Sequence, residues 1–368
     1  MFSLEEIANL LTVLVLLVGL RLTNRLGELA FWVFLGRTAM VFLTNDVLFP
    51  VSYMPDQLGY LNCASMRRGG DPTWCMALAG KTVLNASWFF AYFPLPFIVS
   101  VRSTSLMNVV LIVLLYTYLD RQGFFSERAK LFYLFYPSFM LYAAIGGRDV
   151  LIMFCMFMAM YNLIEKRSVA VGLCWILPLF MIKLQNAFMV MVPFAMHIIA
   201  GKSRGRMVLA ISLGAVFALA MLLGAGYLTD LNKYRTSFYA EDGGVGKAPL
   251  LSPGVMLPIE LLIGAISVLL MPFPWQAGNA FQIIQSLENL VMMWLMISYW
   301  RRLAKPGMEN VFMNLKIFML SSMMIYGAVV FNYGTAARYR FPFVLLFILF
   351  ADRLTMPPLK KIGKLNSL

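Results

Sequence analysis

Long apolar runs recur along the whole chain, and they constrain its fold more than any other feature. Runs of about 16 to 22 residues have the length that an α-helix needs to cross a bilayer. The mean hydropathy of +0.78 and the charged fraction of only 13% are too apolar for a water-soluble fold. The sequence therefore predicts an all-α, polytopic helical integral membrane protein that forms a single transmembrane domain over residues 1–368.

Basic residues gather in the short links between apolar runs, and this placement predicts the topology. Lysine and arginine are enriched in cytoplasmic links, so the net charge of +13 indicates membrane sidedness rather than a nucleic-acid partner. Placing these links inside leaves the N-terminus outside and the C-terminus inside. The eleven expected crossings are 4–20, 28–45, 104–119, 131–146, 149–165, 168–184, 186–200, 207–227, 280–300, 311–332 and 341–356.

Two further apolar stretches would invert this topology if they crossed the membrane. They are 88–101, which contains Pro94 and Pro96, and 255–275. We expect both to be re-entrant or interfacial, because irregular backbone at membrane depth is tolerated where protein or a water-filled cavity shelters it. This assignment leaves a long periplasmic loop at 46–103 and a second outer loop at 228–279.

The cysteines divide into two kinds. Cys155 and Cys174 lie in apolar runs and are expected to be free thiols. Cys63 and Cys75 share the 46–103 loop, and in an oxidising compartment a disulfide between them would close that loop. The single histidine, His197, excludes a histidine-rich metal site.

Charged and polar residues also gather at the outer ends of the helices. Charged groups at membrane depth usually line a cavity and serve a function. Each group here also has a simpler explanation: Arg148 and Asp149 would pair and cap a helix, and the arginines of "RYRF" would reach lipid headgroups. The residues in question are Arg148 and Asp149 in "YAAIGGRDVL", Lys183, Gln185 and Asn186 in "IKLQNA", and Arg338, Tyr339 and Arg340 in "ARYRF".

Carboxylates beside fixed cations on the outer face suit sugar transfer from a lipid phosphate or diphosphate. Arginine binds phosphate oxygens with its planar fork. One carboxylate can act as general base on an acceptor hydroxyl. A second carboxylate can hold a divalent cation, Mg or Mn, beside the leaving phosphate.

Three short motifs resemble those of the GT-C superfamily of membrane glycosyltransferases, over about residues 30–200 and the final fifty. "PDQLGYL" is similar to the first-loop acid motif, "YPSFMLYAAIGGRDVLIMF" to the second outer loop, and "RYRFP" to the segment before the last helix. The resemblance implies that Asp56 is the catalytic base and that Asp149 is a metal-binding or phosphate-organising acid. It also implies that Arg338 and Arg340 hold the donor phosphate.

The remaining members of the predicted site are placed around these residues. Arg148 belongs with the catalytic pair of acids. Tyr60, one helical turn after Asp56, would stack on a sugar face. Lys183, Gln185 and Tyr339 are expected to contact the substrate.

The chain departs from the larger GT-C members in having no soluble C-terminal domain and an extra helix before the acidic loop. These departures also fit Wzy-type and EpsG-type polysaccharide polymerases, whose chemistry centres on arginine. Both groups act on undecaprenyl-linked sugars outside the bacterial inner membrane. The resemblance thus implies an undecaprenyl-linked donor, a glycan or lipid acceptor, membrane lipids and other polysaccharide-assembly proteins as partners, in cell-surface polysaccharide (O-antigen or exopolysaccharide) biosynthesis.

A transporter of lipid-linked sugars or other solutes remains an alternative. Such folds often consist of two related halves with helices broken at mid-membrane. Glu260 and Glu288 favour this alternative because they lie in or beside apolar runs. A membrane scaffold is the third option, and activity of the purified protein without a gradient would distinguish the three.

Overall fold

The fold is helical throughout the part of the chain that the structure describes. The computed structural model describes residues 3–45, 47–51, 56–70, 75, 80–93, 95–166, 168–199, 225–241, 248–254, 256–303 and 309–356. In these ranges the regular elements are helices, with one isolated bridge between Asn45 and Phe49. The predicted all-α class is confirmed.

The described helices follow in chain order. They are α1 (Leu4–Leu22), α2 (Glu28–Thr44), α3 (Asp56–Arg68), α5 (Lys81–Tyr92), α6 (Val101–Arg121), α7 (Glu127–Phe135), α8 (Pro137–Ala144), α9 (Asp149–Ile164), α10 (Val169–Ile182), α11 (Leu184–Ile199), α13 (Ala225–Glu241), α14 (Met256–Leu270), the 3-10 helix η2 (Pro274–Gln276), α15 (Ala280–Leu303), α16 (Glu309–Gly327) and α17 (Tyr333–Thr355).

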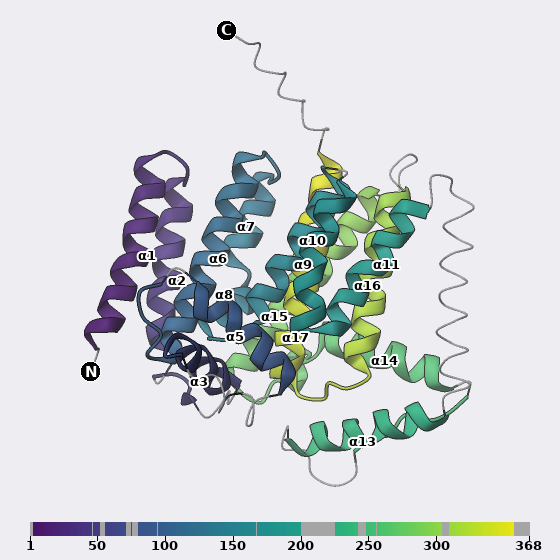
Figure 1. Cartoon of the computed structure of the whole chain (residues 1–368). Coiled ribbons are helices and arrows are strands. Elements are labelled where there is room, and N and C mark those ends of the chain that lie inside the picture. Colours follow the sequence, from purple (N-terminus) through teal and green to yellow (C-terminus); the bar gives the residue numbers. More distant parts are fainter. Residues whose placement is uncertain are drawn as a thin grey trace.

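Most helices run between two opposite ends of the molecule (Figure 1). The links α1–α2, α6–α7 and α9–α10, which carry basic residues, lie together at the upper end of the view. α3, α5 and α13 lie across the lower end. The backbone therefore separates the basic links from the segments that were expected to lie outside.

Two helix boundaries differ from the sequence prediction in ways that affect the site. The expected helix 131–146 is broken into α7 and α8, because Pro137 has no N–H to donate and holds Tyr136 in an extended conformation. α17 starts at Tyr333 rather than 341, with the Asn332 side chain accepting from the N–H of Gly334. The expected crossing at 207–227 lies almost entirely outside the described residues.

Three described helices are long and apolar enough to cross a membrane, namely α6, α15 and α17. Three shorter apolar helices accompany them, α9, α10 and α14. These numbers are smaller than the eleven crossings expected, because the expected crossings 28–45, 149–165, 168–184 and 186–200 correspond to helices of 17 residues or fewer, α2, α9, α10 and α11. The composition and these three helices are consistent with membrane association.

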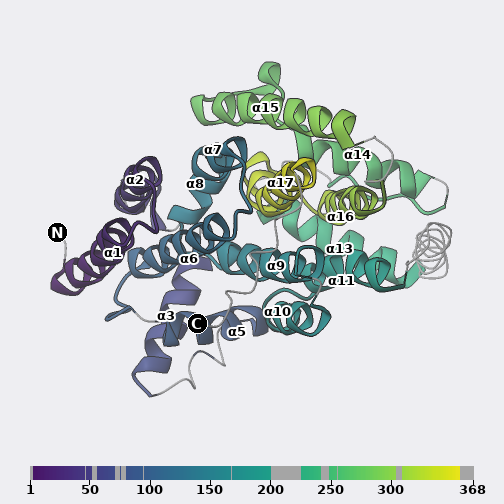
Figure 2. The same ribbon diagram turned by 90° about the horizontal axis from the view of Figure 1, so that it is seen from above.

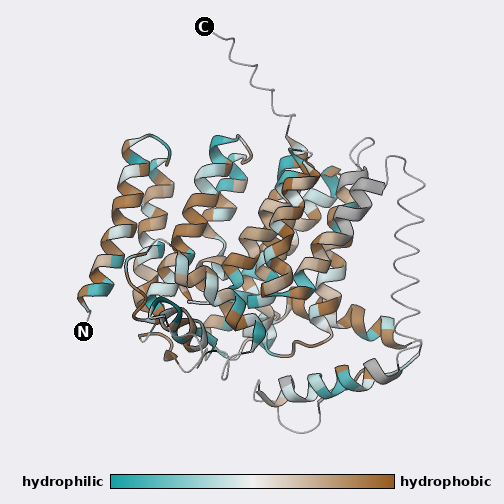
Figure 3. Ribbon diagram, in the orientation of Figure 1, coloured by the Kyte–Doolittle hydropathy of each residue, from teal (hydrophilic) through white to brown (hydrophobic). Residues whose placement is uncertain are grey.

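The core lies between α6, α9 and α17, which carry most of the fully buried side chains. Figure 2 shows α17 enclosed by α8, α9, α15 and α16. α15 is different, because Leu287, Val291 and Trp294 leave its outer face apolar and exposed. Figure 3 shows the same division, with apolar residues along the long helices and polar residues on α3, α13 and the links. An exposed apolar face of this kind suits contact with lipid.

The described part of the predicted loop 46–103 includes two helices, α3 and α5, which we call the cap. α3 and α5 pack together, and Cys63 is disulfide-bonded to Cys75 with a Cα–Cα distance of 5.2 Å, which confirms the predicted pair. The guanidinium of Arg68 donates to the carbonyls of Ala91, Phe93, Leu95 and Pro96. The described part of the stretch expected to be interfacial, 88–101, is thus the end of α5, a non-helical segment at 95–100 that binds Arg68, and the first residue of α6. Cys155 and Cys174 are free.

The second stretch, 255–275, forms α14 and a turn. α14 has 15 residues, and a cis peptide bond between Met271 and Pro272 precedes η2. α14 packs mainly on α16. The Cβ of an alanine at Gly264 would meet the backbone of Gly327 within 3.0 Å, so glycines at both positions allow this close approach.

Labelling of single cysteines tests which end of the bundle faces out. Ala280→Cys places an exposed thiol at the start of α15, and Glu127→Cys places one at the start of α7. In a Cys174→Ser background, we expect a membrane-impermeant maleimide to label position 280 in intact cells. Position 127 should react only after permeabilisation. Labelling of both positions in intact cells would contradict the separation of the two ends.

Candidate functional site

Five segments distant in sequence meet at the capped end of the bundle. They are the start of α3, the loop before α9, the link between α10 and α11, the C-terminal half of α16, and the first turns of α17. Each of these segments starts or ends a helix there, and α16 contributes Tyr326 from its last turn. The side chains that meet are therefore held by helix termini.

Arg338 is the centre of this cluster. Its Nε donates to Asp149 Oδ2 at 2.6 Å, and its Nη2 lies 3.5 Å from Asp56 Oδ2. The two acids differ in exposure, because the side chain of Asp149 is 9% exposed and that of Asp56 is 53% exposed. One arginine thus joins a buried carboxylate to a carboxylate that solvent or a ligand can reach.

The loop before α9 depends on glycine. A Cβ at Gly146 would collide with Thr104 Oγ1 and lie 2.9 Å from the carbonyl oxygen of Val101 on α6. The Asn108 amide donates to the carbonyls of Ile145 and Gly147, and the Gly146 N–H donates to Gln57 Oε1. Buried backbone groups need such partners, so α6 and α3 together fix the chain that presents Arg148 and Asp149.

Two further cations complete the cluster without a carboxylate within ion-pair distance among the described residues. Arg148 Nη1 donates to the carbonyl of Ile182 at 3.2 Å. Lys183, in the link between α10 and α11, is buried with its Nζ 3.9 Å from the centre of the Tyr339 ring. Burial lowers the pKa of Lys183 to about 7, although the carboxylate of Asp149 opposes this shift. An anion beside Lys183 would restore its charge.

Aromatic residues form the walls of the cluster. The Tyr60 ring is fully buried 5.9 Å from the Arg148 guanidinium, and its hydroxyl has no hydrogen-bond partner in the described part of the chain. Burial raises the pKa of Tyr60, so its hydroxyl stays a protonated donor. Tyr326 stacks on Tyr339 with ring centres 4.8 Å apart, and its hydroxyl donates to Asn186 Oδ1 at 2.6 Å.

The structure brings most of the predicted residues together, but not all. Asp56, Tyr60, Arg148, Asp149, Lys183, Arg338 and Tyr339 belong to the cluster. Gln185 is exposed, and its neighbour Asn186 is buried beside Tyr326 instead. Lys183 lies in the link before α11 and Asn186 in the first turn of that helix, where the Asn186 N–H donates to the Lys183 carbonyl at 3.0 Å, so the two residues lie close together.

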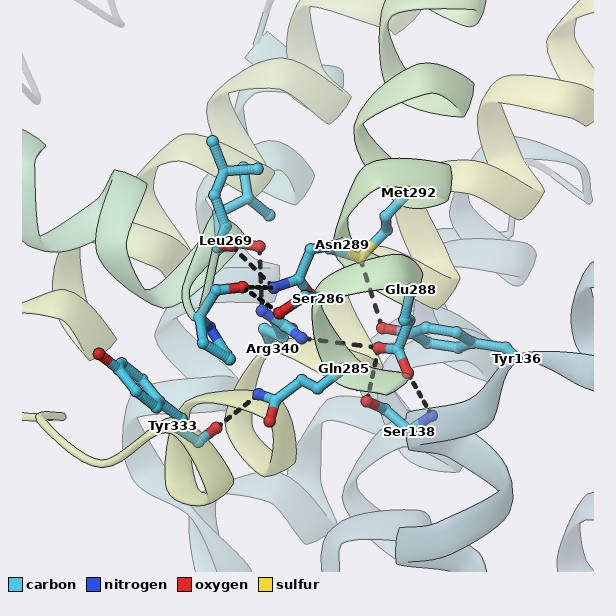
Figure 4. A network of polar contacts seen from close by, with 12 residues as sticks. Tyr136, Ser138, Leu269, Gln285, Ser286, Glu288, Asn289, Met292, Tyr333 and Arg340 are labelled. Atoms are coloured by element: carbon cyan, nitrogen blue, oxygen red, sulfur yellow. Dashed lines mark hydrogen bonds and ion pairs between the residues drawn. The ribbon is translucent and has the colours of Figure 1, made fainter. Parts of the chain in front are cut away.

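Arg340 lies in a separate buried network, shown in Figure 4. Its guanidinium is fully buried, 3.6 Å from the Glu288 carboxylate, and donates to backbone carbonyls at the end of α14. The side chain therefore does not line the cluster around Arg338. Residues two apart on a helix point about 160° away from each other, which explains the separation.

The other acid weighed from the sequence, Glu260, accepts a hydrogen bond from the backbone N–H of Ser252. It therefore supports the turn before α14.

The divalent-cation site expected at Asp149 stays a prediction. The described residues contain no group of three or more histidine, cysteine, aspartate or glutamate side chains that could surround a metal ion. Asp149, the predicted ligand, already accepts from Arg338. The donors facing the cluster are cationic, so they favour an anion over a cation.

Comparisons with known proteins do not assign the chain to a family. No family model, curated protein or solved structure matches it.

The close approach at Gly146 generates a stability prediction. We expect Gly146→Ala to lower the free energy of unfolding by about 1–3 kcal/mol, because the added methyl must displace α6 or the loop. Gly36→Ala is the control, since a Cβ there meets nothing within 4 Å in the middle of α2. Thermal unfolding in detergent measures both, and an unchanged midpoint for Gly146→Ala would contradict the tight packing.

Proposed function

We propose that the chain is a membrane glycosyltransferase that moves a sugar or oligosaccharide from an undecaprenyl phosphate or diphosphate to a glycan or lipid acceptor. The observation that carries this proposal is the pairing in the cluster. Arg338 serves both acids, which leaves Arg148 and Lys183 without an ion-pair partner among the described residues. A buried lysine and a half-buried arginine beside a reachable carboxylate suit an anionic donor with an acceptor hydroxyl nearby.

The donor phosphate would lie against Arg148, Lys183 and the Tyr60 hydroxyl. Arginine and lysine donate charge-assisted hydrogen bonds to phosphate oxygens, and a buried tyrosine hydroxyl without a partner supplies a further donor. Asp149 would take no part in bond making, because its carboxylate holds Arg338 in place.

Asp56 would act as the general base. In the transfer, the acceptor oxygen attacks the anomeric carbon while its proton passes to the Asp56 carboxylate. The bond between the anomeric carbon and the phosphate oxygen breaks, and its electron pair stays on that oxygen. The charge that develops on the phosphate would be stabilised by the surrounding cations.

The proposal includes the membrane context expected from the sequence. The protein would lie in the bacterial inner membrane with the cap and the cluster on the periplasmic side, in a GT-C-like arrangement with about eleven crossings. The separation of the basic links from the cluster supports this orientation. Donor lipid, acceptor and other proteins of polysaccharide assembly would meet it there.

The central place of Arg338 favours a second candidate, an arginine-centred polysaccharide polymerase. Arg338 contacts both acids, so a ligand that reaches the exposed carboxylate of Asp56 would also meet the Arg338 guanidinium. In this variant Asp56 would orient Arg338 and would not accept the proton.

Replacing Asp56 by asparagine separates these two candidates. Asp56→Asn keeps the shape and removes the charge, so as a general base it should lose about a hundred- to ten-thousand-fold in turnover with donor binding retained. Asp230→Asn, an exposed acid paired with Lys233, is the control. The assay uses purified protein with an undecaprenyl-linked sugar and an acceptor in detergent, without a gradient. Normal turnover of Asp56→Asn would favour the arginine-centred polymerase. Absence of sugar transfer by the wild type would contradict both candidates and favour the transporter.

Replacing Arg338 by lysine tests the contact that joins Asp149 to Asp56. Lysine keeps the charge but loses the planar fork that reaches Asp149 and Asp56 together, so we expect transfer to fall about 10- to 100-fold. Arg353→Lys is the matched control, because Arg353 lies at the other end of α17, where it pairs with Glu165 at 3.3 Å. Equal activity of the two variants would contradict a role for Arg338 in the site.

A further inference from the structure

Arg340 joins three helices at one level of the bundle (Figure 4). Its Nη1 lies within 3.2 Å of the carbonyl oxygens of Val268, Leu269 and Met271, at the end of α14. Its Nη2 lies 3.6 Å from Glu288 on α15. A single side chain of α17 thus holds α14 and α15.

Glu288 extends the same connection to α8. Its Oε2 accepts from the N–H of Ser138 at 2.8 Å, and its Oε1 accepts from the Ser138 hydroxyl at 2.6 Å. Ser138 is the second residue of α8, so the carboxylate meets the unpaired N–H groups of a helix N-terminus. α8 then leads through the two glycines to Arg148 and Asp149.

The Arg340–Glu288 pair therefore connects the helix that carries Arg338 to the helix that leads to Asp149. Arg340 fixes the first turns of α17, which carry Arg338, and Glu288 fixes the helix that delivers Asp149. Tyr142 on α8 adds a second link, because its hydroxyl donates to the carbonyl of Gly334 on α17 at 2.6 Å.

A buried ion pair restricts how the helices can pack. Such a pair adds little stability over apolar residues of similar size, but separation of its partners leaves a charge unpaired in the core. Rotation or sliding of α17 would separate Arg340 from Glu288. The allowed position is the one in which Arg338 faces Asp149.

We infer that Glu288 and Arg340 are positioning residues that set the rotation of α17 against α8 and so create the contact between Arg338 and Asp149. The structural part of this inference stands without any assigned activity. Its kinetic consequence, weaker donor binding when the pair is lost, rests on the proposed function.

Glu288→Gln is the decisive variant. The amide can still accept from the Ser138 N–H and donate to its hydroxyl, so chiefly the charge is lost. Glu165→Gln is the matched control, since it removes the partner of Arg353 at the other end of α17. Each variant is made in the full chain. It is measured alone, with Asp149→Asn, with Arg338→Gln, and with both of these substitutions together.

The readout is the coupling between Asp149 and Arg338 in thermal unfolding. In the wild-type and Glu165→Gln backgrounds, Asp149→Asn and Arg338→Gln together should lower the apparent Tm by less than the sum of their separate effects. In Glu288→Gln the losses should become additive. Coupling that persists in Glu288→Gln would overturn the inference, as would its disappearance in Glu165→Gln. If Glu288→Gln does not fold, Ser138→Ala replaces it, and undiminished coupling there would also overturn the inference.

Kinetics separate this inference from the proposed function. If the chain transfers sugars, Glu288→Gln should raise the donor KM about tenfold, with a smaller effect on kcat than Asp56→Asn has. Loss of coupling without any transfer by the wild type would retain the positioning role and refute the transferase. Sugar transfer by the wild type, with coupling and donor KM unchanged in Glu288→Gln, would retain the transferase and refute the positioning role.

Discussion

The contact between Arg338 and Asp149 is the interaction on which the rest of the candidate site depends. A guanidinium inside an apolar bundle is costly unless a carboxylate and hydrogen-bond acceptors meet it. Asp149 supplies both at 2.6 Å, from the first turn of a helix whose N-terminal N–H groups also favour a negative charge. With this charge balanced, Arg338 can extend its remaining donors toward Asp56.

The same constraint explains why so many polar side chains surround the glycine loop. Residues 145–147 interrupt the helices, so their backbone groups would be unsatisfied between apolar neighbours. Asn108 and Gln57 bind this loop, and Asn45 donates to the carbonyl of Ala144 just before it. Arg37 has the same role at the break between α7 and α8, because it donates to the carbonyls of Tyr133 and Leu134. These four polar residues of the core thus lie where helices are broken.

The sequence predicted the helical class and most of the cluster because each depends on a local signal. Apolar runs gave the positions of α1, α2, α6 and α9, and the basic links indicated that Asp149, Lys183 and Arg338 lie at one end. The separation of Arg340 from Arg338 depends on α17 starting at Tyr333, and no apolar pattern marks residues 333–340 as helical. The partners of Arg340, Glu288 and the carbonyls of α14, are joined to it only by tertiary packing. Exposure of Gln185 and burial of Asn186 likewise depend on how α11 meets α16.

The unequal environments of the two acids assign different roles to them. Asp149 is enclosed by its own helix, by Arg338 and by the glycine loop, so a ligand cannot approach it without displacing Arg338. Asp56 begins α3, which the Cys63–Cys75 disulfide and the contact between Gln57 and Gly146 hold against the bundle. Among the described residues, its carboxylate has one ion-pair contact, with Arg338 at 3.5 Å. In the proposed reaction, burial rather than residue type distinguishes the acid that would orient Arg338 from the acid that would accept the proton, and the disulfide-bonded α3 presents the exposed acid beside the cations.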